Sequence, residues 1–331
     1  MPSAGSVAVV VVNASSGAHI GRTLDALARQ TVRPRRTIVV DNASVDGSAD
    51  AIARLHPDAE LVRLAENAGF AAATNLGARL AGGCDWVATL NPDAFPEPGW
   101  LEALLGAAEA NPAYASFGSR LVCAADEAVL DGTGDRYHVN GFAWRRDHGC
   151  SATTVRPSGE VFSPCAAAAL YRRDAFLEVG GFDEAFFCYF EDTDLAFRLR
   201  LLGHRSLYVG EAVALHVGSA SAGRLSDFTL FHQYRNCVWT YAKDMPWPLL
   251  VVYLPQHVLT QLLLLVWGVR RRRARIVLRA QWAALTSLPG ILARRRRVQG
   301  QRVVGALELR RSMARGLSAY VAAAGRARAV S

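Results

Sequence analysis

Two groups of acidic residues stand out because their positions suit metal-assisted chemistry. Asp93 follows an apolar segment, residues 86–90, through the sequence Asn91-Pro92-Asp93. A buried strand gains no stability from a carboxylate at its tip, so this side chain is expected to bind a ligand, most simply a divalent cation. The second group, Glu191-Asp192-Thr193-Asp194, opens a segment with helical spacing. If folding brings the two groups together, the second group could supply a general base beside the cation.

The first 110 residues alternate short β-branched segments with segments of helical spacing. This alternation predicts an α/β fold with right-handed crossovers and a mostly parallel, doubly wound sheet. Ligands of such sheets bind at the carboxyl edge of the strands, where this chain carries Asn13, Asp41 and Asp93, so these residues are expected in one crevice. The expected strands are residues 7–12, 37–40, 60–64 and 86–90, and the expected helices are residues 20–30, 48–55 and 69–80.

The following segment, residues 115–165, lacks this regularity. It is expected to continue the same domain as mixed strands and loops, with turns such as Asp131-Gly132-Thr133-Gly134. Helices are expected at residues 172–179 and 192–202, and a strand at residues 206–209. His216 lies in an apolar segment after that strand, and by itself such a histidine is either a packed core residue or a cation ligand.

Asp41 and the segment from Asn67 to Gly77 are candidates for nucleotide binding. An acid at the end of the second strand can accept a hydrogen bond from a ribose hydroxyl or a nucleobase N–H, and a turn or helix-capping role is the alternative. The asparagines and glycines of Asn67-Ala68-Gly69-Phe70 and Asn75-Leu76-Gly77 would let a nucleotide approach the backbone closely. A plain helix start explains the same residues.

Several classes of protein are excluded by missing motifs. The turn after the first strand, residues 13–18, holds one glycine instead of the G-x-G-x-x-G of dinucleotide enzymes, and no G-x-x-x-x-G-K-[ST] occurs. The six cysteines are scattered without C-x-x-C spacing, which favours reduced thiols in a cytosol over disulfides or a zinc site. The first residues contain neither a basic segment nor an apolar segment long enough for a secretion signal.

Charge is distributed unevenly along the chain. Residues 270–331 contain 16 arginines and one acid, Glu308, whereas residues 1–269 carry a net charge of −7. An acidic body with a cationic tail predicts that the tail meets an anionic surface. Nucleic acid is a poor candidate because aromatic residues are not interleaved with the arginines.

Two apolar segments near the carboxyl end are each followed by four arginines, the arrangement expected at anionic lipid headgroups. Residues 249–269 contain no formal charge and are long enough to span a membrane. Their proline and polar side chains favour a helix that lies in the interface or re-enters it, and a soluble core helix is the third interpretation. The second segment comprises residues 281–292.

Taken together, the motifs resemble those of the family-2 glycosyltransferases of the GT-A fold, in order and spacing, from about residue 7 to residue 217. The Asn-Pro-Asp variant is most similar to the branch that contains rhamnosyltransferases and some galactofuranosyltransferases. The matching motifs are Asp41-Asn42-Ala43-Ser44-Val45-Asp46, Asn67-Ala68-Gly69-Phe70, Asn75-Leu76-Gly77, Asn91-Pro92-Asp93, Gly180-Gly181-Phe182-Asp183-Glu184 and Glu191-Asp192-Thr193-Asp194-Leu195.

The resemblance implies a role for each motif. Asp192 would be the catalytic base, and Asp93 with His216 would hold Mg²⁺ or Mn²⁺ against the donor diphosphate. Asn91 stands where the family's D-x-D motif has its first aspartate, which lowers the charge of the site. Asp183 and Glu191 would lie on the acceptor side, where Glu191 could orient the acceptor or a basic group. The residues implied to bind the nucleotide sugar are Asn13, Asp41, Asn67, Gly69, Asn75, Asn91 and Asp93.

The resemblance therefore implies an inverting glycosyltransferase, bound peripherally at the inner face of the cell membrane, that moves L-rhamnose from dTDP-rhamnose to a cell-envelope glycan or a polyprenyl-linked saccharide. Residues 1–227 would form the catalytic domain, with a nucleotide-sugar half up to about residue 110, and residues 228–331 a helical, Arg-rich, membrane-associated region. The competing hypotheses are a family-2 enzyme with UDP-galactofuranose or a UDP-hexose as donor, a nucleotidyltransferase, and a non-catalytic glycan- or membrane-binding scaffold.

Overall fold

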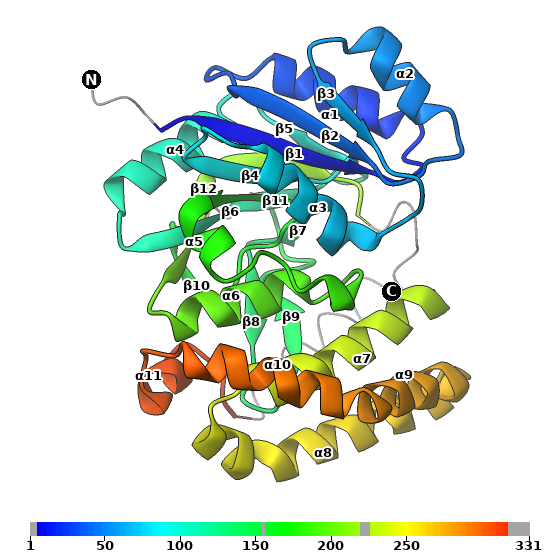
Figure 1. The fold of residues 1–331 in the computed structure, drawn as a ribbon, viewed down its shortest axis with the longest axis vertical. Helices are drawn as coiled ribbons and strands as arrows, with labels where there is room; N and C mark the ends of the chain where they lie inside the picture. Colours follow the sequence, from blue (N-terminus) through cyan, green and yellow to red (C-terminus); the bar gives the residue numbers. More distant parts are fainter. Residues whose placement is uncertain (1–4, 154–155, 219–225, 317–331) are drawn as a thin grey trace.

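The computed structural model describes residues 5–153, 156–218 and 226–316; the last part of the expected Arg-rich region, residues 317–331, lies outside them. In this part of the chain a central sheet lies between helices, with a further helical layer below it (Figure 1). The strands are β1 (Val7–Asn13), β2 (Arg36–Asp41), β3 (Glu60–Arg63), β4 (Trp86–Leu90), β5 (Ala94–Pro96), β6 (Tyr114–Cys123), β7 (Leu130–Gly132), β8 (Asp135–Tyr137), β9 (Ala143–Arg145), β10 (Gly159–Val161), β11 (Ala168–Arg172) and β12 (Arg205–His216).

The helices begin and end close to where the sequence predicts them. The boundaries expected for residues 48–55 and 69–80 are those observed. The helices are α1 (His19–Ala28), α2 (Ser48–Leu55), α3 (Gly69–Leu80), α4 (Trp100–Ala110), α5 (Arg173–Glu178), the 3₁₀ turn η1 (Glu184–Phe186), α6 (Glu191–Leu201), α7 (Asp227–Asp244), α8 (Trp247–Arg270), α9 (Ala274–Thr286), α10 (Leu288–Gly300) and α11 (Ala306–Arg311).

Helices cover both faces of the sheet because β1 is apolar from Val7 to Val12 and buries alternate side chains on opposite faces. Val7, Val9 and Val11 face one layer, in which α1, α2 and α4 pack. Ala8, Val10 and Val12 face the other, in which α3, α5 and α6 pack. A Cβ added at Gly77 of α3 would lie 2.4 Å from Cγ1 of Val10, so glycine permits this helix to approach the sheet closely.

The sheet is mixed, with a parallel first half. Its strand order in the described residues is β10-β12-β6-β11-β4-β1-β2-β3, and β3, β2, β1 and β4 are parallel neighbours. β11 lies antiparallel between β4 and β6, whereas β12 runs parallel to β6. The GT-A architecture with a mainly parallel core is therefore confirmed, and residues 115–165 supply the irregular strands β6 to β10.

The carboxyl ends of the parallel strands collect the polar residues expected there. Asn13 and Asp41 are register partners at the ends of β1 and β2. β5, which begins directly after Asp93, pairs with the end of β12 so that Ala94 lies opposite His216. Two segments more than a hundred residues apart in sequence thus place Asp93 and His216 side by side.

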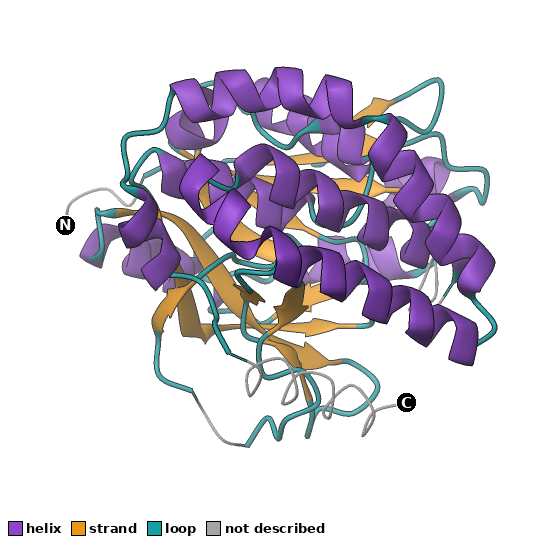
Figure 2. Cartoon of the chain, turned by 90° about the horizontal axis from the view of Figure 1, so that it is seen from below, coloured by secondary structure: helices purple, strands orange, loops and turns teal. Residues whose placement is uncertain are grey.

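Helices α7 to α10 form a layer on the side of α6 away from the sheet, and they spread across the molecule when it is seen from below (Figures 1 and 2). Within the described residues, α8 has the length and apolar composition to cross a membrane, and α9 with α10 would do so only as a pair bent by 58°. The apolar segment expected at residues 249–269 lies in α8, and the one at residues 281–292 is divided between α9 and α10.

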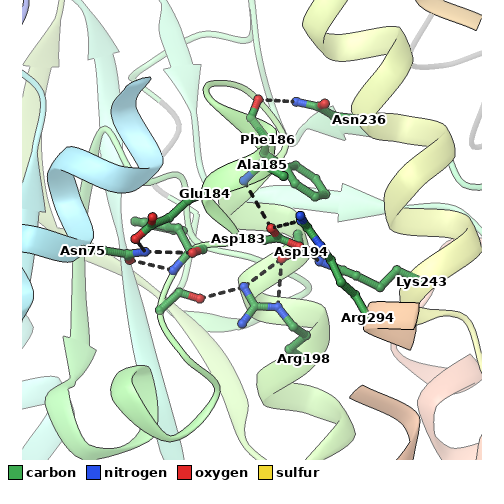
Figure 3. Close-up of polar contacts among 12 residues, drawn as sticks. Asn75, Asp183, Glu184, Ala185, Phe186, Asp194, Arg198, Asn236, Lys243 and Arg294 are labelled. Atoms are coloured by element: carbon green, nitrogen blue, oxygen red, sulfur yellow. Dashed lines mark hydrogen bonds and ion pairs between the residues drawn. The ribbon is translucent and has the colours of Figure 1, made fainter. Parts of the chain in front are cut away.

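A buried ion cluster joins this layer to α6 and to the segment before it (Figure 3). Lys243 of α7, the single lysine of the sequence, is 1% exposed and contacts the carboxylates of Asp194 in α6 and Asp183, the latter at 2.7 Å. Arg198 donates to Asp194 from the next turn of α6, at 2.8 Å. Arg294 of α10 reaches Asp183 from the outside, with its side chain 46% exposed. The position of α6 therefore depends on contacts with α7.

Lys243→Met should lower the free energy of unfolding by about 3–5 kcal/mol, because it removes the most deeply buried cation of the cluster and leaves Asp194 and Asp183 with one cationic partner fewer. Arg294→Met is the matched control: it removes a half-exposed cation from the same Asp183 and should cost less than about 1 kcal/mol. Urea denaturation of both variants measures the difference. Equal, small losses would contradict the dependence on Lys243.

Candidate active site

Asn13 and Asp41 form a hydrogen-bonded pair at the carboxyl edge of the sheet. The Asn13 amide nitrogen lies 2.8 Å from Oδ1 of Asp41 and 2.8 Å from the hydroxyl of Ser48. Both side chains are buried. Oδ2 of Asp41 accepts a long bond, 3.4 Å, from the backbone N–H of Ser44 and retains capacity for a further donor. The geometry agrees with a carboxylate that Asn13 holds in place to receive hydroxyl or N–H groups of a ligand.

The two asparagines before and within α3 bind other parts of the protein. Asn67 accepts bonds from Asn42 and from the backbone of Gly69. Asn75 is fully used: its amide accepts from Phe182 N and donates to Phe182 O and to Glu184. A direct contact of Asn75 with a nucleotide would cost these bonds, so in this structure its amide holds the segment around Phe182.

Gly69 is required by another close approach. It has φ +86°, and a Cβ there would lie 2.6 Å from the ring of Phe187 and 2.7 Å from its carbonyl oxygen. The Ala71 N–H also donates to Phe187 O. The amino end of α3 thus packs directly on the segment that leads into α6, which joins the nucleotide and acceptor sides of the predicted site.

Asp93 and His216 face one another across the end of the sheet. His216 Nε2 lies 3.5 Å from Oδ1 of Asp93 and 3.4 Å from the amide nitrogen of Asn91. The other ring nitrogen, Nδ1, lies 2.8 Å from Oδ2 of Asp131, the middle residue of β7. The structure therefore brings together the residues predicted to hold a cation and adds Asp131, which the sequence analysis noted only as part of a turn.

The carboxylates of Asp93 and Asp131 favour positive charge around His216. Burial tends to raise the pKa of Asp93, but the hydrogen bond and charge of His216 outweigh burial and hold that pKa below its ordinary value. Burial tends to lower the pKa of His216, whereas Asp131 and Asp93 together raise it. An ionised carboxylate and an imidazole nitrogen 3.5 Å apart lie near the ~3 Å spacing of adjacent ligands around Mg²⁺ or Mn²⁺. These residues fit such an ion.

Glu191 and Asp192 begin α6, after Phe190 in a left-handed conformation with φ +68°. Asp192 accepts hydrogen bonds from the backbone N–H groups of Ala166, at 3.2 Å, and Thr193, at 2.7 Å. Burial raises the pKa of Asp192 despite these bonds. Glu191 is 6% exposed, and burial together with the charge of Asp192 raises its pKa well above the ordinary value.

A second carboxylate, Asp135 of β8, accompanies Asp192. The nearest ligand atoms of Asp135, Cys165 and Asp192 all lie within 4.8 Å of one another. Burial is the largest cause and the charge of Asp192 the second largest, and they raise the pKa of Asp135 to about 7. The Cys165 thiol, whose pKa burial raises far above neutrality, is a poor partner for Mg²⁺ or Mn²⁺. The group therefore suits proton transfer better than cation binding.

Arg145 of β9 connects the two halves of the site. One guanidinium nitrogen contacts Asp131, which holds His216, and another lies 2.9 Å from the sulfur of Cys165, beside Asp192. The sequence analysis missed Arg145 and Asp135, because the three-residue strands β7, β8 and β9 are too short to show a period. The one signal for them is the presence of charged residues in a segment that is otherwise buried.

Asp183, predicted on the acceptor side, has its carboxylate engaged by Lys243, Arg294 and the backbone N–H of Ala185. Its side chain is 15% exposed. It thus holds the segment before α6 against α7 and α10, as Figure 3 shows. A contact with an acceptor would have to share these ion pairs.

Comparisons with known proteins agree on one family. Residues 6–180 match the model of glycosyl transferase family 2. The chain is 35% identical over 242 residues to N-acetylglucosaminyl-diphospho-decaprenol L-rhamnosyltransferase of Mycobacterium tuberculosis, covering 65% of this chain and 77% of that protein. It is 32% identical over 216 residues to the pre-mycofactocin glycosyltransferase of the same organism, covering 65% and 43%.

Solved structures share the fold at low sequence identity. A mannosyltransferase from Pyrobaculum calidifontis, in complex with GDP-Man and Mn²⁺, superposes with a TM-score of 0.53 at 20% identity over 87% of this chain and 79% of that one. GalNAc-T7 with UDP, GalNAc and Mn²⁺ gives a TM-score of 0.58 at 13% identity, over 73% and 48%. Both are GT-A proteins solved with a divalent cation.

The carboxyl group of Asp135 should titrate near pH 7, and Asp192→Asn should move this step to lower pH because the neighbouring charge that raises the pKa is gone. Carbon-13 NMR of aspartate carboxyl groups between pH 5 and 9 measures the step. Asp135→Asn should abolish the titration step near pH 7. Asp126→Asn, which changes an exposed aspartate, should leave that step unchanged. A step that persists in Asp135→Asn would contradict the assignment.

Proposed function

Because this chain belongs to glycosyl transferase family 2, we propose that it is an inverting glycosyltransferase that uses a divalent cation and a nucleoside-diphosphate sugar. Membership of the family makes the chain a glycosyltransferase. The use of a cation, the inversion of configuration, and the identity of the donor and the acceptor are what we propose. One observation carries the proposal: Arg145 contacts both parts of the site. Its guanidinium group contacts Asp131, the partner of His216, which in turn faces Asp93. The same guanidinium group lies beside Cys165, in the group that contains Asp192.

In the proposed site Asp93 and His216 hold Mg²⁺ or Mn²⁺, which offsets the negative charge that develops on the leaving diphosphate. Asp41, held by Asn13, accepts hydrogen bonds from the ribose or the base, while Asn67, Gly69 and Asn75 shape the adjacent wall. Asn91 replaces an acid beside His216 and contributes an amide instead of a charge. This site therefore depends on His216 for its second cation ligand.

Asp192 is proposed as the base. Two backbone N–H groups orient its carboxylate, and its burial and raised pKa make it a better proton acceptor than an exposed aspartate. It takes the proton of an acceptor hydroxyl as that oxygen bonds to the anomeric carbon and the bond to the diphosphate breaks. One base and one displacement give inversion. Burial raises the pKa of Glu191 well above its ordinary value, which favours the protonated form, and that form can donate a hydrogen bond to the acceptor.

The proposed donor is dTDP-L-rhamnose, and the proposed acceptor is a polyprenyl-diphosphate-linked saccharide or a related cell-envelope glycan. The support is the similarity to the mycobacterial L-rhamnosyltransferase, whose name includes a diphospho-decaprenol acceptor. The second candidate is a family-2 enzyme that uses UDP-galactofuranose or a UDP-hexose; a non-catalytic scaffold is disfavoured by the retained Asp93, Asp192 and His216. Residues 1–227 are the proposed catalytic domain and residues 228–331 the membrane-associated region.

Asp192→Asn should retain donor binding and lower the transfer rate by about 10²–10⁴-fold, because the amide cannot accept the proton. Calorimetry measures donor affinity, and transfer to a synthetic lipid-linked acceptor measures rate, with Asp126→Asn as the control. Substantial transfer by the variant would remove Asp192 as the base. Since the variant does not consume its donor, a thermal-shift screen of nucleotide sugars with Mn²⁺ can use it to identify the donor.

Helices α8 and α9 carry the proposed membrane-binding face. Large apolar side chains remain exposed on both, such as Leu259 at 55% and Trp282 at 70%. The exposed Arg270, Arg271 and Arg272 lie where the two helices meet. Apolar side chains bordered by arginines fit an anionic lipid surface better than water. We therefore place the enzyme peripherally at the inner face of the cell membrane, where a lipid-linked acceptor presents its sugar.

Leu259→Gln combined with Trp282→Gln should weaken binding to anionic phosphatidylglycerol vesicles at least about tenfold, because each side chain contributes about 1.5–3 kcal/mol when it leaves water. Co-sedimentation of the full chain measures binding. Leu55→Gln, which alters an equally exposed leucine in α2, is the control. If the double variant binds as well as the control, this face does not contact the membrane.

A further inference from the structure

The buried carboxylate of Asp131 has no role in the function described so far. Its side chain, in the middle of β7, is 3% exposed, and Oδ2 lies 2.8 Å from Nδ1 of His216. Arg145 contacts the same oxygen, and His148 lies 3.6 Å from the other. Three cationic or hydrogen-bonding groups therefore converge on one carboxylate.

One oxygen of Asp131, Oδ2, contacts both the guanidinium of Arg145 and Nδ1 of His216. Arginine can only donate hydrogen bonds, so this oxygen acts as an acceptor towards Arg145. A carboxylate oxygen that accepts from Arg145 is placed to accept from His216 as well. This geometry favours a proton on Nδ1 of the histidine.

The position of that proton decides what the opposite ring nitrogen can do. With Nδ1 protonated, a neutral His216 presents the lone pair of Nε2, which faces Oδ1 of Asp93 at 3.5 Å and the Asn91 amide at 3.4 Å. The opposite tautomer would point an N–H at the cation position and exclude the ion. Asp131 is also held in place, because Arg145 and His148 bind it from other sides.

We propose that Asp131 is the positioning residue of the cation site: it fixes the orientation and tautomer of His216 so that Nε2 binds the divalent cation together with Asp93. The inference depends on the proposed function, in which Asp93 and His216 are the ligands. Arg145 supports Asp131 from behind, which couples the cation site to the residues around Asp192.

Cation affinity tests the proposal without any measurement of activity. Asp131→Asn should weaken Mn²⁺ binding about 10–100-fold, the usual effect of losing such a partner of a ligand histidine. Electron paramagnetic resonance of free Mn²⁺ measures this affinity in the presence of thymidine or uridine diphosphate. Asp126→Asn, an exposed aspartate that precedes the same strand, should bind as tightly as the unaltered protein.

A second measurement needs no variant at Asp131 and so does not depend on that variant folding. Nitrogen-15 NMR of histidine rings, with the His216 signals identified by their loss in His216→Gln, should show Nδ1 protonated and Nε2 unprotonated once the ring is neutral. In Asp131→Asn the proportion of this tautomer should fall. An Nε2-protonated ring in the unaltered protein would overturn the proposal.

Two outcomes of the binding experiment separate this inference from the proposed function. If Asp93→Ala and His216→Ala lose Mn²⁺ but Asp131→Asn binds normally, the cation site stands and the positioning role of Asp131 is wrong. If Asp93→Ala and His216→Ala leave Mn²⁺ affinity unchanged, the proposed cation site is wrong and the inference falls with it.

Discussion

The buried contact of Lys243 with Asp194 and Asp183 is the constraint on which the arrangement of the site depends. α6 carries Asp192 in its first turn, and the same helix is held two residues later through Asp194. A charge removed from water is stable only while its partners stay in place, so α7 cannot move away without exposing or orphaning carboxylates. The helical layer that is proposed to meet the membrane and the proposed base are thereby parts of one rigid assembly.

The second determinant is the register of the sheet. Pairing of β5 with β12 places Asp93 beside His216, and pairing of β1 with β2 places Asn13 beside Asp41. Backbone hydrogen bonds fix these positions regardless of which ligand is present. The proposed site residues at the strand ends are therefore held rigidly, which suits a reaction in which developing charge must be met by groups already in position.

The sequence predicts the first four parallel strands and their helices because short β-branched segments alternate with segments of helical spacing, and helices 48–55 and 69–80 have the expected ends. The resemblance to the family also implies that Asp93 and His216 approach each other. The sequence cannot predict Asp131, Asp135 or Arg145, since strands of three residues show no period and their contacts span long sequence separations. The sequence also does not predict the partners of Asn75 and Asp183, because tertiary packing alone brings Phe182 to Asn75 and Lys243 to Asp183.

The burial of the only lysine side chain has a practical consequence. Reagents that acylate amines need an exposed, neutral amine, and the surrounding carboxylates raise the pKa of Lys243 while burial excludes the reagent. The rate at which Lys243 is acylated would therefore report how often α7 separates from α6. The sequence contains no other lysine, so an acylated lysine side chain in this protein can only be Lys243.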